Sequence, residues 1–327
     1  MMLDIIAFCA IAGMLSVYTL LDGYDLGAGA ISLVLAKTRP ERRAILKSIG
    51  PFWSGNEVWL IAAGGALFAF FPKAYAVSFS GFYLPFIIVL WLLMFRGVAI
   101  EVRDHLRGDV WTDFWDAAFS ISSLLLIVLF GVALGNLVRG LPLNPDGYFL
   151  GTFSSLLNPY AVSVGVLALL ALVQHGLAYV AANVEGQLGE RALQFIGRLW
   201  WFALVAYIVV SVATITRYGS GGHASTGLAV AASAIAVIAL VALSYTAARR
   251  RAVATFRASL AFVAGLLVAA SATMYPFLIR PLPGAKGGLT IFEGSVPPAT
   301  LAVSLTVALA GLVLVAAYSI FIRRRWL

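Results

Sequence analysis

The sequence predicts an all-α, polytopic membrane protein that forms a single transmembrane helical domain over residues 1–327. Hydrophobic residues make up 62% of the chain and charged residues only 11%, whereas about 25% of the residues in a soluble globular protein are charged. The apolar residues also gather into nine runs of the ~20 residues that a helix needs to cross a bilayer. These observations exclude a soluble protein and favour nine transmembrane helices.

Short polar loops separate the nine runs, and none of the loops is long enough to form a domain of its own. The first run lacks a basic leader and a small-residue cleavage site, so we expect it to remain in the mature protein. The expected spans are residues 3–36, 52–71, 76–100, 114–135, 160–182, 199–216, 226–247, 258–279 and 299–322.

The basic residues predict the orientation of these spans. With the N-terminus outside, 17 of the 22 Lys and Arg residues fall in cytoplasmic segments, and the outer loops hold only Lys73, Arg139, Arg217, Arg280 and Lys286. Cytoplasmic loops of membrane proteins carry an excess of Lys and Arg. We therefore predict an outer N-terminus, a cytoplasmic C-terminus and an odd number of spans.

Charge and cysteine content exclude two further classes of protein. The formal net charge of +8 is explained by the loop asymmetry, so it does not indicate a nucleic-acid partner. The single cysteine, Cys9, cannot form a disulfide or a thiolate metal site within this chain. We predict no metal ligands in this chain.

Two carboxylates inside the first span are the leading functional candidates. Asp22 and Asp25 lie three residues apart, so they share one helix face and are expected to titrate as a coupled pair. A carboxylate in the bilayer is costly unless it is partnered, neutral or hydrated. Gly23, Gly27 and Gly29 leave the adjacent surface open to another helix or to a cofactor. The alternative is that both acids only cap or hydrogen-bond a neighbouring helix.

The second span contributes a third acid. Pro51 suits a first helical turn, which places Glu57 about 8 Å from the cytoplasmic end at ~1.5 Å per residue. We expect a ladder in which Glu57 lies low, Asp25 near the middle and Asp22 one turn further out. Such a ladder suits a hydrated proton path from the cytoplasm. Alternatively, the helix dipole alone favours Glu57 in the first turns.

Charged residues crowd the cytoplasmic end of the third span. Arg103, Asp104 and His105 are interpreted as a solvated rim, where snorkelling and mutual pairing are inexpensive. Arg96 lies deeper and needs an acidic partner, for which Glu101 is one candidate.

The fifth span contains an intramembrane histidine, His175, beside Gln174. Histidine in this setting can ligate haem or relay protons. A hydrogen bond to a neighbouring backbone carbonyl is an equally good explanation, so both alternatives stay open.

Taken together, the motifs resemble subunit II of cytochrome bd-type quinol oxidases over essentially the whole chain. In order, they read LLDGYDLGAG, GPFWSGNEVWLIAAGGALFAFFP, SFSGFYLPFIIVL, FRGVAIEVR, GNLVRGLPLN, LLNPYAV and MYPFLIRP. The resemblance implies a terminal oxidase subunit of the prokaryotic cytoplasmic membrane, in a complex that oxidises quinol and reduces O2 to water. It also implies a heterodimer with a similarly folded subunit I that holds haems b and d and the quinol-oxidising site.

The resemblance further assigns roles to residues of this chain. It implies no haem ligand here, a cytoplasmic proton path through Asp22 and Asp25, and in some members a structural quinone. The family has an acid at the position of Ser54, so Glu57, or Ser54 with water, is expected to take over that step. Arg96, Glu101 and His175 are candidates for structural or haem-edge contacts. Short outer loops suggest a cyanide-insensitive or otherwise divergent branch, and a small single-span accessory subunit and lipids are expected neighbours.

Two rival functions use the same residues. A proton-coupled secondary transporter also needs acids near the membrane centre, but internal repeats of the transporter kind are not evident in this sequence. A scaffold subunit without a part in the chemistry is the other alternative.

Overall fold

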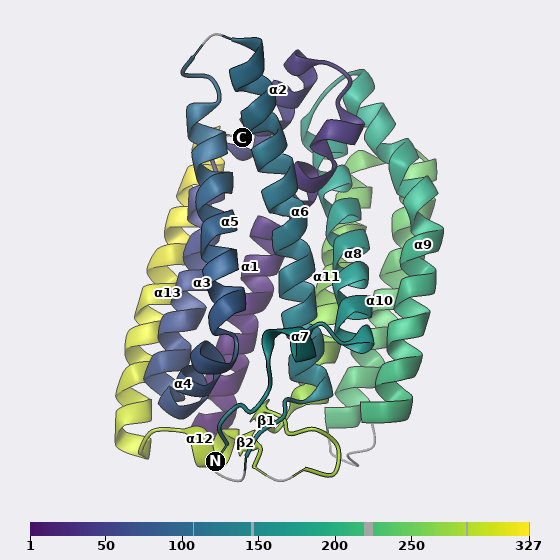
Figure 1. The fold of residues 1–327 in the computed structure, drawn as a ribbon. Helices are drawn as coiled ribbons and strands as arrows, with labels where there is room; N and C mark the ends of the chain where they lie inside the picture. The colour runs from purple at the N-terminus through teal and green to yellow at the C-terminus, as the bar shows by residue number, and fades with distance from the viewer. Residues whose placement is uncertain (107, 145–146, 219–224, 286, 327) are drawn as a thin grey trace.

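The computed structural model describes residues 1–106, 108–144, 147–218, 225–285 and 287–326, and its long helices run side by side (Figure 1). Eight helices in this part of the chain are long and apolar enough to cross a membrane. They are α1 (Met2–Leu35), α5 (Tyr83–Val102), α6 (Asp109–Arg139), α8 (Pro159–Asn183), α9 (Gln187–Tyr218), α10 (Ser225–Ala248), α11 (Ala252–Met274) and α13 (Pro298–Trp326). The prediction of an all-helical, polytopic membrane protein is confirmed.

The second predicted span corresponds to α3 (Trp53–Phe70), which packs between α1 and α13. It is 18 residues long and is not one of the eight helices above, because its first two turns carry the polar Asn56 and Glu57. The short elements are α2 (Arg39–Ile49), α4 (Pro72–Gly81), α7 (Phe153–Leu156), α12 (Ile291–Gly294), β1 (Phe277–Ile279) and β2 (Leu289–Thr290).

Two predicted spans extend past the end of the helix that the structure forms. The third span was expected over residues 76–100, but Phe82, at φ −102° and ψ 25°, separates α4 from α5. The eighth span was expected over residues 258–279, but α11 ends at Met274 and residues 277–279 form β1. Pro276 explains the second difference, because proline has no N–H to donate and its ring clashes with the preceding helical turn.

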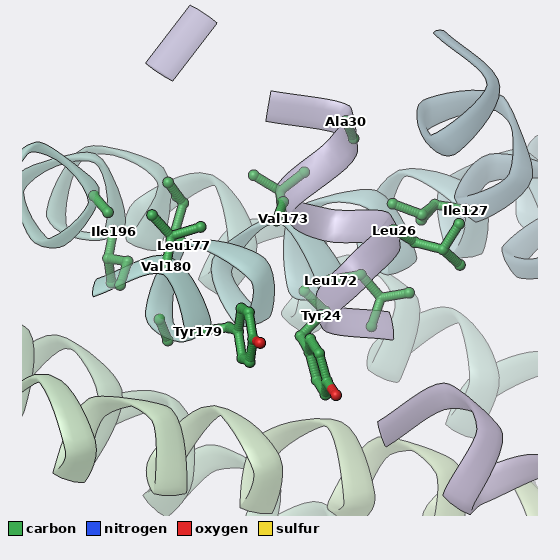
Figure 2. Packing of buried hydrophobic residues seen from close by; sticks show 14 of the residues in the cluster. Tyr24, Leu26, Ala30, Ile127, Leu172, Val173, Leu177, Tyr179, Val180 and Ile196 are labelled. Carbon is green, nitrogen blue, oxygen red and sulfur yellow. The ribbon is translucent and has the colours of Figure 1, made fainter. Parts of the chain in front are cut away.

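The hydrophobic core is centred on α8. In the most apolar stretch of this helix, 67% of the residues are buried. This helix packs against α1, α6, α9 and α11. Figure 2 shows part of the core, in which side chains from α1, α6, α8 and α9 meet; Leu26, Ile127, Leu172, Leu177 and Ile196 are among them.

The glycines of the first span bring helix backbones into contact. A Cβ atom on Gly27 would lie 1.8 Å from the carbonyl oxygen of Leu172, and one on Gly176 would lie 2.1 Å from the amide nitrogen of Ala28. A Cβ on Gly29 would lie 2.4 Å from the Oγ of Ser123 in α6. Small residues at such crossings allow the close packing that stabilises helices in lipid. The open face expected from the sequence is therefore occupied by α8 and α6.

The two ends of the bundle differ in structure. The N-terminus, α4, α7, α12 and the antiparallel pair β1–β2 lie at one end, whereas α2 and the end of α13 lie at the other (Figure 1).

Ion pairs attach α2 to the neighbouring helices. Arg39 pairs with Asp109 and Asp113 of α6, and Glu41 accepts a hydrogen bond from Arg191 of α9. Burial raises the pKa of Glu41, but hydrogen bonds from the Lys37 amide and from Arg191 outweigh it, so the pKa lies below its ordinary value. Glu41 is therefore ionised at neutral pH and holds α2 against α9.

We expect Gly27→Ala to destabilise the protein by about 3 kcal/mol or more, because overpacking costs ~1–3 kcal/mol even where neighbours can adjust. Here the obstacle is the backbone of α8. The measurement is the thermal unfolding midpoint of the purified protein in detergent. Gly13→Ala on the same helix is the matched control, because a Cβ there meets no described atom within 4 Å. Equal midpoints for the two variants would contradict the argument.

Candidate functional site

A buried arginine lies at the centre of the acidic residues. Arg96 of α5 and Asp22 of α1 are both 0% exposed. The guanidinium group donates two hydrogen bonds to the carboxylate, from Nη1 to Oδ2 at 2.9 Å and from Nη2 to Oδ1 at 2.5 Å. This bidentate geometry is the strongest pairing that arginine forms with a carboxylate.

Two more carboxyl groups adjoin the same guanidinium. Nη1 of Arg96 also donates to Oε1 of Glu57 at 3.1 Å, and its Nη2 lies 3.9 Å from Oδ2 of Asp25, which is fully buried. One positive charge therefore faces three carboxyl groups from α1 and α3. The expected ladder of acids is instead a compact cluster around Arg96, and we call Asp22, Asp25, Glu57 and Arg96 the acid cluster.

Asn56 completes the environment of Asp25. Its Nδ2 lies 2.8 Å from Oδ2 of Asp25, 3.2 Å from the hydroxyl of Tyr24 and 3.2 Å from the carbonyl oxygen of Leu21. Asn56 and Glu57 are adjacent on α3, so Asn56 contacts Asp25 while Glu57 contacts Arg96. Asn56 was not predicted as a site residue; the signal was a polar amide directly before Glu57 in the second predicted span.

The acid cluster reaches the protein surface through Glu57. This side chain is 23% exposed and lines a groove of about 420 Å³ between α3 and α5, together with Trp53, Gly97 and Glu101. Glu101 accepts a hydrogen bond from the indole of Trp53 at 3.3 Å. The pairing of Glu101 with Arg96 considered from the sequence is thus wrong, because Asp22 and Glu57 bind that guanidinium. Ser54 is exposed on the first turn of α3.

His175 is engaged through both ring nitrogens. Nδ1 lies 2.7 Å from the Oγ of Ser259 in α11, and Nε2 lies 3.1 Å from the carbonyl oxygen of Leu20 in α1. The ring is fully buried and stacks on Phe256 with 5.3 Å between ring centres. A haem iron would have to displace one of these hydrogen bonds, so the geometry fits the backbone-carbonyl alternative and does not fit an axial ligand.

A second buried ion pair lies at the α2 end of the bundle. Nε of Arg103 donates to Asp116 of α6 at 2.5 Å, and the two side chains are 4% and 2% exposed. The prediction of a solvated rim is wrong for Arg103, although it holds for the exposed Asp104 and His105. Asp116 was missed, and the signal was an acid near the start of the fourth predicted span.

The chain is similar to known proteins over nearly its whole length. The family model for cytochrome bd terminal oxidase subunit II matches residues 3–325. A probable cytochrome oxidase subunit 2 of Haemophilus influenzae is 31% identical, over 93% of this chain and 89% of that protein. The chain belongs to the cytochrome bd terminal oxidase subunit II family.

Other members of the family agree over shorter segments. Subunit 2 of the cytochrome bd-I ubiquinol oxidase of Escherichia coli K12 is 40% identical, over 53% of this chain and 47% of that protein. Subunit 2 of the Bacillus subtilis cytochrome bd ubiquinol oxidase is 37% identical, over 64% of this chain and 62% of that protein. The predicted family is confirmed, and subunit II is a multi-pass protein of the prokaryotic cytoplasmic membrane.

A solved structure supports the fold. A chain of the bd oxidase from Geobacillus thermodenitrificans superposes on this chain with a TM-score of 0.80 and is 21% identical to it. The superposition covers 100% of this chain and 99% of the Geobacillus chain. At this identity the likeness shows that the two chains share a fold.

We expect Arg96→Gln to lower the yield of folded subunit II strongly, because removing one partner of a buried ion pair costs about 3–5 kcal/mol. Adding Asp22→Asn to Arg96→Gln removes the uncompensated carboxylate and should recover part of that loss. The measurement is the unfolding midpoint and yield after purification. Arg43→Gln is the control, since its pair with Asp104 is exposed and such pairs contribute about 0–1 kcal/mol. A double variant no more stable than Arg96→Gln would contradict this account.

Proposed function

We propose that this chain is subunit II of a heterodimeric oxidase that oxidises quinol and reduces O2 to water, and that its acid cluster conducts protons from the cytoplasm. Family membership supports the reaction, since curated members are ubiquinol oxidase subunits. The observation that carries the proton-conducting role is the meeting of three carboxyl groups on the single guanidinium of Arg96 within the membrane-spanning region. O2 reduction consumes protons, and hydrocarbon does not conduct them.

The groove suggests the direction of the path. Glu101 lies at the α2 end of α5 and Glu57 lies further along the same groove, where its carboxyl group meets Arg96. We place proton uptake at this groove, followed by transfer through Glu57 to Asp25 and then to Asp22, with Arg96 holding the carboxyl groups together. Ser54, exposed one helical turn before Glu57, is proposed to assist Glu57 through water.

The topology that suits this path has nine spans, namely the eight apolar helices and α3. The two chain ends lie at opposite ends of the bundle (Figure 1), which supports an odd number of crossings. An outer N-terminus places α2 and most Lys and Arg residues in the cytoplasm, as the positive-inside rule favours. The whole chain forms one membrane domain.

Haems b and d are assigned to subunit I. Both ring nitrogens of the buried His175 are engaged in hydrogen bonds within this chain, which supports that assignment. When bound in subunit I, haem supplies the electron transfer and O2 reduction. A structural quinone, lipids and a single-span accessory subunit remain proposed components of the complex.

Co-purification tests the proposed complex. We expect tagged subunit II to bring down a second multi-span chain with haem absorbance, whereas subunit II expressed alone should bind no stoichiometric haem. His175→Ala should leave the haem spectrum of the complex unchanged. A colourless preparation without the second chain, or one haem per isolated subunit II that is lost in His175→Ala, would contradict the division of labour.

Asp25→Asn tests the proton path. The substitution keeps the size and hydrogen-bonding capacity of the side chain but removes its titration. We expect the complex to assemble with normal haem spectra while quinol-driven O2 consumption falls at least about tenfold, or roughly 1.4 kcal/mol in barrier. Glu57→Gln should slow turnover less, because Ser54 and water offer a detour.

Asp109→Asn is the control for this experiment, because Asp109 is 82% exposed and pairs with Arg39 outside the acid cluster. It should retain wild-type turnover. An assembled, spectrally normal Asp25→Asn complex that turns over at the wild-type rate would refute the proton-conducting role and favour a scaffold.

A further inference from the structure

The amide of Asn56 is surrounded by more acceptors than it has hydrogens. Nδ2 carries two N–H bonds, yet three oxygen atoms lie within 3.2 Å of it, those of Leu21, Tyr24 and Asp25. Asn56 is also 4% exposed, so water at the protein surface does not compete for these bonds. The two hydrogens are therefore shared among one carboxyl group, one hydroxyl group and one carbonyl group.

The hydroxyl of Tyr24 is a fixed member of this set. The Tyr24 ring stacks on Tyr179 with 4.2 Å between ring centres (Figure 2), and its other neighbours include the rings of His175 and Phe256. Tyr179 is itself held, because its hydroxyl donates to the carbonyl oxygen of Ser48 at 2.6 Å. Tyr24 therefore cannot follow a moving partner, and the amide of Asn56 has to adjust instead.

We propose that Asn56 is the positioning residue of Asp25: its amide orients the carboxyl group and redistributes its two hydrogen bonds when Asp25 gains or loses a proton. This inference rests on the proposed proton-conducting role of Asp25. An ionised carboxylate attracts an N–H donor more strongly than a neutral carboxyl group does. When Asp25 is protonated, an N–H of Asn56 turns to the hydroxyl of Tyr24 or to the carbonyl of Leu21.

The charged groups around Asp25 are engaged with arginines. Asp22 and Glu57 are hydrogen-bonded to Arg96, whose Nη2 is 3.9 Å from Asp25. On α8, His175 and Tyr179 contact the ring of Tyr24, and α11 adds the uncharged Phe256. The buried acid of α6, Asp116, is bonded to Arg103 and Arg42. Asn56 is thus a buried neutral donor to Asp25, whereas Asp22 has a bidentate cation.

The test is the pH profile of quinol-driven O2 consumption by the complex with subunit I. Asn56→Leu retains the approximate volume of the side chain and removes the donor, so the carboxylate of Asp25 loses stabilisation. We expect turnover per assembled complex to fall about threefold to tenfold, and the limb of the profile that depends on Asp25 to move to higher pH by about one unit. In an Asp25→Asn background, Asn56→Leu should produce no further shift.

Asn136→Leu is the matched control. Asn136 is equally buried, and its Nδ2 donates to the carbonyl oxygens of Val132 and Leu156, away from the acid cluster. Its loss should reduce the yield of assembled complex and leave the pH profile in place. A wild-type profile in Asn56→Leu, together with turnover within twofold of wild type, would overturn the proposal.

A second variant covers the case in which Asn56→Leu does not assemble. Asn56→Gln keeps the amide and moves it by one methylene group, and we expect it to shift the infrared carboxyl band that disappears in Asp25→Asn. An unmoved band and an unmoved pH profile in Asn56→Gln would refute the positioning role. If Asp25→Asn itself turns over normally, the proposed proton path fails first; if only the Asn56 variants behave as wild type, only this inference fails.

Discussion

The pairing of Arg96 with Asp22 is the interaction on which the membrane-embedded site depends. Both side chains are fully buried, and an isolated charge of either sign in this region is strongly unfavourable. Because Glu57 binds the same guanidinium, the pairing joins α1, α3 and α5. The positions of Asp25 and Asn56 then follow from the helices that carry them. A charge network of this kind fixes geometry more than it adds stability, since desolvation offsets much of the attraction.

The opposite face of α1 is fixed by shape alone. Gly27 and Gly176 bring the backbones of α1 and α8 into contact, and this contact sets Tyr24 beside Tyr179. A single helix therefore presents its acids to α3 and α5 and its glycines to α8 and α6. The combination explains why the motif LDGYDLGAG alternates charged and glycine positions so closely: the two kinds of residue serve different neighbours.

Much of this arrangement followed from the sequence because it depends on local rules. Composition and run length identified the membrane class and the approximate position of α3 and the eight apolar helices, and the three-residue spacing correctly put Asp22 and Asp25 on one face. The partner of Arg96 did not follow, since Glu101 is close in sequence while Asp22 is 74 residues away. Arg103 was misjudged and Asp116 was missed because burial at a helix end depends on the packing of α2 and α6, which lie apart from each other in the sequence. Pro276 was a local signal for the end of α11, but the hydrophobic residues at 275–279 favoured a longer predicted span.

The separation of Asp22 from Arg96 along the chain has a consequence for biogenesis. Synthesis proceeds from the N-terminus, so α1 reaches the membrane with both acids before the 74 residues that lead to Arg96 have been added. A carboxylate at the centre of an inserting helix costs about 2.5–3.5 kcal/mol on the insertion scale. The first helix is therefore poorly suited to lipid on its own. It acquires its counter-charge only when α5 has been added, so we expect α1 to be stable in lipid only after α3 and α5 have packed beside it.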